Sequence, residues 1–263
     1  MVCAAGSRSP SEDRRMIDLQ RLARIENEVS IVAASSNRGL MLFGSVARGD
    51  DTDESDIDIL QLVSTNLGPR TTCGNFVFSN YATQQLRRMF CSGNLFALHL
   101  LHDGVILSDP YGELQDCLDS YTPPNGYTKV LEELGWTAKF LAVDCDTFEM
   151  YSTNLVALGI YILRTKLFVD CAKSGRPSFS VPDISRRFAD PRIQVVYNLG
   201  KKSSVSFLEF EELKAVIEKY LAVKIQNEFG SFNDLIQMTP VNYALARKLA
   251  WRTRRSSPLA AYE

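Results

Sequence analysis

Apolar residues between positions 16 and 32 recur at the spacing of one helix face. Ser9, Pro10 and Glu12 precede them in the positions of an N-cap, a first-turn proline and a capping-box partner. The pattern therefore predicts a helix that begins near Pro10. Small and polar residues at 35–39 end the helical spacing and predict a loop.

Shorter apolar runs follow, and they contain the β-branched and aromatic residues that favour strands. Four such runs predict strands at residues 40–43, 57–63, 75–79 and 105–107. Between the last two runs, apolar spacing predicts helices at residues 82–92 and 95–101. The first half of the chain therefore combines strands with helices.

The sequence YTPPNG at residues 121–126 interrupts this pattern, because two prolines and a glycine stop both helix and sheet. We place a domain boundary there, so that a first domain spans residues 1–122. The apolar spacing beyond it is helical over residues 131–143, 148–171 and 207–228, with proline-bearing loops at 177–182 and 191. This half is expected to form a helical domain at 127–250, followed by a basic, flexible C-terminal tail at 251–263.

Composition excludes several classes of protein. Of the 263 residues, 45% are hydrophobic and 23% are charged, which is ordinary for a folded globular chain and excludes extended disorder. The 29 Lys and Arg residues nearly balance the 31 Asp and Glu residues, so the formal net charge of −2 creates no overall positive field for nucleic acid. Any basic surface must therefore be local.

The cysteines and the lengths of the apolar runs bear on location. Six cysteines are scattered without a C-x-x-C pair, and only His99 and His102 accompany them, so we expect no zinc cage. Scattered thiols suit a reducing compartment. No apolar run approaches the ~18 residues of a membrane span, and no signal-peptide pattern follows the first basic residues. We therefore expect a soluble, cytoplasmic protein.

One stretch combines features of a catalytic site: G-S-V-A-R-G at residues 44–49, an acidic loop, and S-D-I-D-I at residues 55–59. Alternate side chains of a strand share a face, so Asp56 and Asp58 are expected to point the same way. Neighbouring carboxylates repel one another unless a cation lies between them, and such hard oxygen ligands suit Mg²⁺ completed by substrate phosphates. The Gly-Ser turn opens a short predicted helix, whose N-terminus favours phosphate. The alternative is a plain turn beside a solvated edge strand.

This combination resembles the nucleotidyltransferase signature of the DNA polymerase β superfamily, G-S-x-A-R-G followed by S-D-[IL]-D. The resemblance implies an α+β fold, in which a small mixed-sheet nucleotidyltransferase core precedes a helical domain. It also implies a nucleoside or deoxynucleoside triphosphate bound by Gly44, Ser45 and Arg48, with two divalent ions, Mg²⁺ or Mn²⁺, on Asp56 and Asp58. The shared reaction is transfer of a nucleotidyl group to an acceptor hydroxyl with release of pyrophosphate.

The chain departs from this family pattern at the third metal ligand. Members carry a third carboxylate on the next strand, whereas residues 64–94 contain no Asp or Glu. Asn75 stands near the expected place, and Asp103 is the nearest later acid. Three alternatives follow: the ligand comes from elsewhere, a water molecule replaces it, or the site is degenerate and only binds nucleotide.

Basic residues of the helical half are candidates for contacts with the triphosphate. In two-domain members of the superfamily the helical domain often supplies a basic side chain, which the resemblance assigns to Arg164 and Lys166, with Lys201 and Lys202 as further candidates. A solvated helix face explains each of these residues equally well. His99 lies among leucines and is expected to be a packed histidine rather than a general base.

The C-terminal segment combines cations, an aromatic residue and a tyrosine. Five cations fall within residues 247–255, with Trp251 among them, a composition that suits single-stranded nucleic acid or an acidic partner. A basic helix end followed by a flexible tail is the simpler interpretation. Residues 256–262 span at most ~25 Å when extended, at ~3.3–3.6 Å per residue, which gives the Tyr262 hydroxyl the reach to enter a nucleotide site.

This organisation is similar to the nucleotidyltransferases of Hailong-type bacterial antiphage systems, which make short deoxyadenosine oligomers without a template and start them on a hydroxyl near their own terminus. The resemblance implies Tyr262 as a catalytic acceptor and a single-stranded oligonucleotide as the product. In those systems the product holds a membrane effector channel closed, so a membrane effector protein is an expected partner. A homo-oligomer is also expected.

Other acceptors fit the same core. Enzymes that transfer AMP to aminoglycosides resemble this chain in layout, and they need acidic side chains for a polycationic substrate. The helical half offers Glu132, Glu133, Asp144, Asp146 and Glu149. An antitoxin-type enzyme that modifies a partner protein is a second alternative, and a degenerate nucleotide-binding module is a third.

Overall fold

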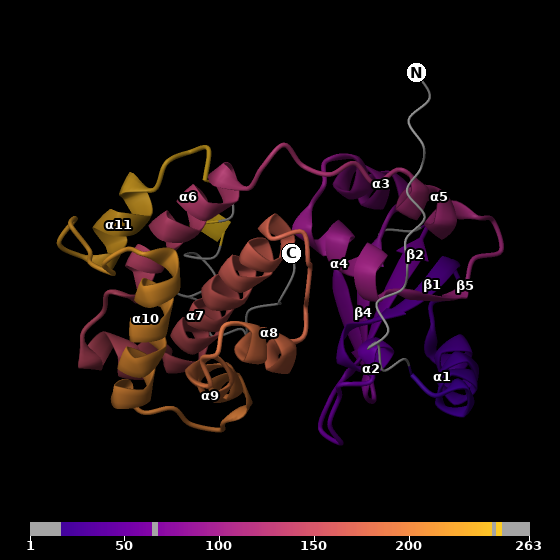
Figure 1. Cartoon of the computed structure of the whole chain (residues 1–263), viewed down its shortest axis with the longest axis horizontal. Coiled ribbons are helices and arrows are strands. Elements are labelled where there is room, and N and C mark those ends of the chain that lie inside the picture. The colour runs from indigo at the N-terminus through magenta and orange to yellow at the C-terminus, as the bar shows by residue number, and fades with distance from the viewer. Residues whose placement is uncertain (1–16, 65–67, 244–245, 249–263) are drawn as a thin grey trace. The chain divides into compact units, whose positions relative to one another are not determined.

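The computed structural model describes residues 17–64, 68–243 and 246–248. Contacts within the chain divide it into two compact units (Figure 1). The first unit comprises Met1–Cys91 and Asp103–Tyr121, and the second comprises Ser92–His102 and Thr122–Glu263.

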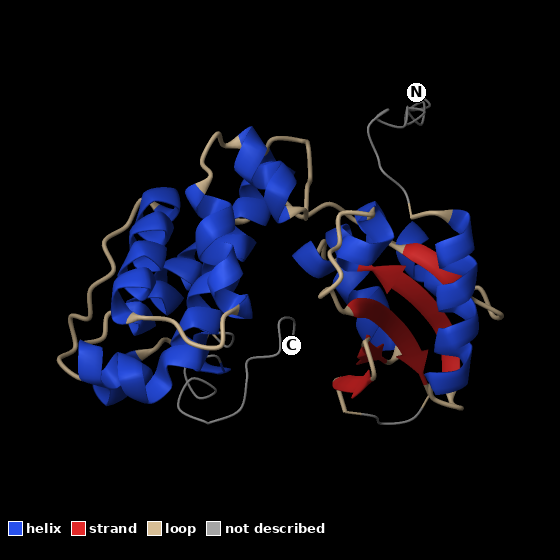
Figure 2. Cartoon of the chain, turned by 90° about the horizontal axis from the view of Figure 1, so that it is seen from below, coloured by secondary structure: helices blue, strands red, loops and turns tan. Residues whose placement is uncertain are grey.

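The described part of the first unit contains a five-stranded mixed sheet with the order β3-β4-β2-β1-β5 (Figure 2). The strands are Asn37–Phe43 (β1), Ile57–Val63 (β2), Arg70–Cys73 (β3), Phe76–Tyr81 (β4) and Val105–Ser108 (β5). β2 and β4 are parallel, whereas the other neighbours are antiparallel. The α+β fold expected from the sequence is confirmed. β3 was not predicted, because all of its residues are exposed and carry no apolar alternation.

Four helices of the first unit are described: α1 (Leu19–Val32), α2 (Gly44–Arg48), α3 (Thr83–Cys91) and α5 (Glu113–Asp119), the last of which was not predicted. α1 begins at Leu19 because the Asp18 carboxylate accepts a hydrogen bond from the backbone N–H of Arg21 at 3.3 Å. The prediction of one continuous helix from Pro10 is wrong at this point. Residues 9–12 themselves lie outside the described residues.

Alternation along the strands decides which face of the sheet each side chain occupies. Leu42 and Ile59 pack on one face in a buried cluster with Val29 of α1. Leu60 lies on the opposite face, where Leu114 of α5 packs against β1. Both faces are therefore covered, and the even-numbered residues of β2 belong to the α5 face.

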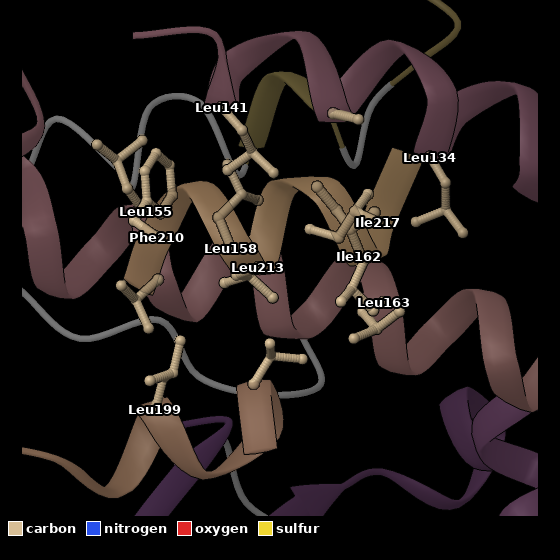
Figure 3. Close-up of a cluster of buried hydrophobic side chains, with 14 of the residues drawn as sticks. Leu134, Leu141, Leu155, Leu158, Ile162, Leu163, Leu199, Phe210, Leu213 and Ile217 are labelled. Atoms are coloured by element: carbon tan, nitrogen blue, oxygen red, sulfur yellow. The ribbon is translucent and has the colours of Figure 1, made fainter. Parts of the chain in front are cut away.

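The described part of the second unit is helical. Its helices are α4 (Leu95–Asp103), α6 (Thr128–Ala138), α7 (Cys145–Lys173), α8 (Val181–Arg187), α9 (Arg192–Tyr197), α10 (Phe207–Leu221) and α11 (Phe232–Met238), with 3-10 turns at Lys139–Leu141 and Asn198–Lys201. Asp103, the last residue of α4, is assigned to the first unit. Figure 3 shows the buried core between α7 and α10, which includes Leu158 and Ile162 of α7 and Phe210 and Leu213 of α10. Within the described ranges, none of the helices has the length and apolar character needed to cross a membrane.

The second unit corrects two expectations from the sequence. The loop predicted at residues 177–182 contains the start of α8, because proline is accommodated in the first turn of a helix, where its missing N–H is not needed, whereas the loop predicted at Pro191 is present directly before α9. The helix predicted over residues 207–228 ends at Leu221, since Ala222 adopts the left-handed conformation with φ 55°.

Candidate active site

The Gly-Ser turn lies at the end of β1. Gly44 has φ +80°, and α2 starts there and ends at Gly49, which has φ +71°. These two positive φ angles explain why glycine flanks this five-residue helix. Val46 and Ala47 are buried in the cluster with α1, whereas Ser45 on the same turn remains half-exposed. The turn is therefore anchored on its apolar side and presents Ser45 toward solvent.

Asp58 lies against the backbone of this turn. In the β1–β2 ladder Phe43 pairs with Asp58, which places the first residues of α2 beside the start of β2. A Cβ atom added to Gly44 would lie 2.6 Å from the Asp58 Oδ2 atom. Only a residue without a side chain can therefore occupy position 44 while Asp58 keeps its place.

The second acid of the motif, Asp56, lies immediately before β2. It is exposed, whereas Asp58 is half-buried. The backbone N–H of Ile57 donates a hydrogen bond to the Asn75 carbonyl at 2.9 Å, which continues the extended pairing at this end of β2. Alternation therefore places the two acids on the same face, the one opposite α1.

The strand next to β2 carries no acid at this level. Asp58 pairs with Val77 of β4, which is buried. Asn75 precedes β4 and is exposed, and its backbone carbonyl pairs with β2. Within the part of the chain that the structure describes, His, Cys, Asp and Glu residues nowhere form a group of three suited to a metal ion. The described carboxylates of the motif thus number two, Asp56 and Asp58.

Asp103, the nearest later acid, pairs with Arg48. The Arg48 Nη1 donates to Asp103 Oδ2 at 2.7 Å, and the Asp103 side chain is 1% exposed. The Arg48 Nε donates to Asp50 Oδ1 at 3.1 Å. Burial by itself would lower the pKa of Arg48, but the charges of Asp103 and Asp50 and the hydrogen bonds to both raise that pKa above its ordinary value.

A second ion pair fixes the acidic loop that joins α2 to β2. The guanidinium of Arg21 on α1 donates to both carboxylate oxygens of Asp51, with Nη1 3.0 Å from Oδ1. This hydrogen bonding holds the pKa of Asp51 below its ordinary value and raises the pKa of Arg21. Asp53 and Glu54 on the same loop are exposed. The loop therefore keeps exposed negative charge beside Asp56.

The four basic candidates of the helical half lie in the second unit. Lys166 forms an ion pair with Asp170 one turn along α7. The Arg164 guanidinium lies over the Phe168 ring at 6.0 Å from its centroid, and Arg164 lines a small apolar cavity with neighbouring side chains of the unit. Lys202 forms an ion pair with Glu209, and the hydrogen bonds from Lys202 and Ser206 together lower the pKa of Glu209 to about 2. Lys201, the last residue of the 3-10 turn Asn198–Lys201, is exposed.

His99 is a packed histidine, as the sequence indicates. It is 5% exposed and stacks on Phe179 with ring centroids 4.3 Å apart. Two of the acids considered for a cationic substrate also have structural contacts. The Asp144 carboxylate caps α7, and Glu133 accepts a hydrogen bond from the backbone N–H of Ala246 at 3.1 Å. Tyr262 and most of the basic C-terminal cluster lie outside the described residues.

Comparison with known proteins agrees with this geometry. Residues 24–87 match the family model of the nucleotidyltransferase domain. This segment is similar to nucleotidyltransferase domains. Such a domain implies a nucleoside triphosphate substrate and nucleotidyl transfer by a transferase enzyme, and the family generally uses divalent metal ions. The matched segment contains the Gly44 turn and both acids of the motif.

A solved structure gives a second similarity. The chain is similar to a nucleotidyltransferase-like protein from Exiguobacterium sibiricum, with 17% identity, coverage of 77% of this chain and 74% of the other, and a TM-score of 0.30. The comparison with curated proteins found no match.

Sequence reasoning missed the contact between Arg48 and Asp103. Arg48 was assigned to the nucleotide because it belongs to the motif, and Asp103 was considered as a metal ligand. The two residues are 55 positions apart in the sequence, and no local pattern connects them. The antiparallel pairing of β1 with β5 brings them together, which a single sequence does not reveal.

Proposed function

We propose that this chain is a metal-dependent nucleotidyltransferase that transfers a nucleotidyl group from a nucleoside or deoxynucleoside triphosphate to an acceptor hydroxyl and releases pyrophosphate. The close approach of Gly44 to Asp58 carries this proposal, because it places a helix-opening turn beside a carboxylate. A turn of this kind favours phosphate, and a carboxylate favours a divalent cation. The family match over residues 24–87 supports the same activity.

The donor set fits a divalent cation that shares its ligands with a triphosphate. Asp56 and Asp58 supply hard oxygen ligands, and Mg²⁺ or Mn²⁺ commonly combines one or two carboxylates with phosphate oxygens and water. We propose that these two acids hold two such ions, which neutralise the triphosphate and activate the acceptor oxygen. Since Val77 faces Asp58 from β4, the remaining ligands come from the substrate and from water.

The protein's own groups bind and orient the substrate. The half-exposed Ser45 hydroxyl donates to a phosphate oxygen, and the first N–H groups of α2, which have no partner within the helix, are further donors. Buried Val46 and Ala47 prevent the turn from yielding when the substrate binds. The chain therefore contributes positioning and charge balance, which account for most of the catalysis of phosphoryl-type transfer.

For the acceptor we propose Tyr262, with a short, template-independent deoxyadenosine oligonucleotide as the product and antiphage defence as the role. The sequence supports this proposal: a phenol follows the Ser-, Pro- and Ala-containing residues 256–261, and the basic segment at 247–255 suits a single-stranded product. The ordinary pKa of tyrosine is about 10, so the phenol needs a neighbouring base or cation to become nucleophilic at neutral pH.

One experiment tests both nucleotidyl transfer and self-priming on the protein's own hydroxyl. The purified protein is incubated with Mg²⁺ and each NTP or dNTP in turn, and its intact mass and the released pyrophosphate are measured. A ladder of deoxyadenylate additions with dATP is expected. A single addition, or turnover only when an external hydroxyl compound is supplied, would replace the self-priming proposal with one of the other acceptors. No nucleotide binding and no pyrophosphate release would refute nucleotidyl transfer itself.

Three variants assign the result to residues. Asp58→Asn should abolish transfer, because an amide is a poor ligand for Mg²⁺, while the fold remains as stable or slightly more stable once carboxylate repulsion is relieved. Tyr262→Phe should abolish protein-linked product and leave nucleotide binding unchanged, because only the acceptor oxygen is removed. Asp53→Asn is the matched control: it removes one exposed negative charge from the acidic loop that precedes β2 and should retain transfer.

A further inference from the structure

Asp103 lies beside α2 because of the order of strands in the sheet. β5 pairs with β1, and Val105 stands opposite Leu42, near the point where β1 gives way to α2. Asp103 precedes β5 by two residues, so it borders α2 on the side opposite the start of β2. The short helix is thus flanked by Asp58 on one side and by Asp103 on the other.

The guanidinium of Arg48 joins the end of α2 to Asp103, which is distant in sequence, and to Asp50, which follows just after α2. It donates through Nη1 to Asp103 at 2.7 Å and through Nε to Asp50 at 3.1 Å. Asp103 is one of the few buried acids among the described residues, and its side chain is 1% exposed. A buried carboxylate without its cation is strongly unfavourable, so this pair resists opening.

Because Arg48 lies at the end of α2, the ion pair between Arg48 and Asp103 can control the position of the Gly44–Gly49 turn. α2 has five residues, so Arg48 and Gly44 lie at opposite ends of an element ~7 Å long at ~1.5 Å per residue. Gly44 is the residue whose added Cβ would collide with Asp58. A change of tilt at the Arg48 end therefore alters the approach of Gly44 and Ser45 to Asp58.

We propose that Arg48 is a positioning residue that acts through Asp103 to hold the Gly44–Gly49 turn against Asp58, and not a ligand of the triphosphate. The proposal rests on the proposed nucleotidyl transfer. It goes beyond it by assigning Asp103 a role in the reaction without contact with substrate or metal.

The direction in which Asp103→Asn changes the rate constant of transfer separates positioning by Arg48 from triphosphate binding by Arg48. Asp103→Asn removes a negative charge near the binding site of a polyanion, so electrostatics alone predicts tighter nucleotide binding. If Arg48 bound the triphosphate, release from Asp103 would also strengthen that contact. If Arg48 positions the turn, Asp103→Asn loosens α2, and the rate constant of transfer falls. Of these two roles for Arg48, only positioning predicts a loss.

The experiment compares Asp103→Asn, Arg48→Lys and the double variant with wild type. Nucleotide Kd is measured by calorimetry, kcat and KM by pyrophosphate release, and amide hydrogen exchange is followed for residues 44–49. Each single variant should lower kcat by roughly tenfold or more, with a smaller change in KM, and the double variant should lose no more than the larger single loss, because both remove one interaction. Exchange in residues 44–49 should be faster in all three variants.

Glu113→Gln provides the matched control. Glu113 forms a more exposed ion pair with Arg38 in the same unit, distant in sequence from α2. Its loss should lower stability and leave both kcat and exchange in residues 44–49 unchanged.

Two results would overturn the positioning role. One is tighter binding with undiminished kcat in Asp103→Asn, and the other is unchanged exchange in residues 44–49 in both single variants. The exchange measurement needs no substrate, so it decides the role of Arg48 even if wild type shows no transfer. A wild type that neither binds nor transfers nucleotide would instead refute the proposed function.

Discussion

Replacement of Gly44 by alanine tests the link between the turn and Asp58 most directly. Gly44→Ala adds one methyl group and imposes two separable costs. The first is backbone strain, since Gly44 has φ +80°, and an L-residue in the left-handed region costs ~1–2 kcal/mol. The second is a collision, because the new Cβ lies 2.6 Å from Asp58 Oδ2.

The collision can be converted into an expected loss of activity. Ordinary van der Waals contact begins near ~3.4 Å, so the carboxylate must retreat by roughly 0.8 Å from its position 2.6 Å away. A displacement of about 1 Å in a reacting group lowers the rate by about 100-fold. We therefore expect Gly44→Ala to lose about two orders of magnitude in kcat. Its unfolding free energy should fall by ~2–4 kcal/mol, from strain and overpacking together.

Gly112→Ala separates strain from collision. Gly112 has a similar φ of +69°, and an added Cβ would meet no atom within 4 Å. Both variants also lower the entropy of the unfolded chain equally, which cancels in the comparison. Urea unfolding should show a loss of ~1–2 kcal/mol for Gly112→Ala, with transfer unchanged. Equal stability losses in the two variants, or full activity in Gly44→Ala, would refute the contact between the turn and Asp58.

Three further predictions follow from other groups. The Asp190 carboxylate accepts hydrogen bonds from Arg192, Lys219 and Tyr220, and the bond from Arg192 leads the effects that hold its pKa below the ordinary value of 3.8. The stabilisation by the ionised Asp190 is therefore present above about pH 4 and is lost as the pH falls below that. Asp190→Asn should flatten the acid limb of a plot of unfolding free energy against pH and should cost ~2–4 kcal/mol at pH 7 in urea unfolding. An unchanged acid limb would contradict this. The buried thiol of Cys117, whose pKa is raised to about 11 by burial, should resist a thiol reagent at pH 8 in the folded protein while exposed cysteines react, and early labelling identified by peptide mass would contradict this. Val77→Ala should leave the Mn²⁺ affinity in the presence of nucleotide unchanged within a factor of about two, because Val77 contributes packing and no metal ligand. It should lower the unfolding free energy by ~1–2 kcal/mol. A large loss of Mn²⁺ affinity in calorimetry would show that β4 shapes the site.

The local part of the site could be predicted from the sequence. The Gly-Ser turn follows one apolar run and the two acids begin the next, so hairpin-like pairing of β1 with β2 is enough to bring Gly44 near Asp58. Short apolar runs indicate both strands, and the last five residues of each strand are buried, as expected for strands covered on both faces. These features depend on neighbours within about twenty residues, which is the range over which propensity and periodicity act.

The remaining features depend on partners distant in sequence. Val77 faces Asp58 only because β4 lies parallel to β2, and a parallel pairing has no local signature. Arg48 meets Asp103 only because β5 returns to β1. Pro182 predicts a loop in the sequence because proline both starts and interrupts helices, and Ser180 as the N-cap distinguishes the two only once the backbone is known.

The assignment of α4 to the second unit limits where this chain can be cut into fragments. The chain leaves the first unit after Cys91, contributes Leu95, Leu98 and the stacked His99 to the helical core, and returns at Asp103. A fragment that ended at Tyr121 would carry α4 without the core it packs on, and would expose an apolar surface of the kind that drives aggregation. The first unit therefore does not correspond to a simple N-terminal piece of the chain, because one of the helical unit's own helices is encoded within it.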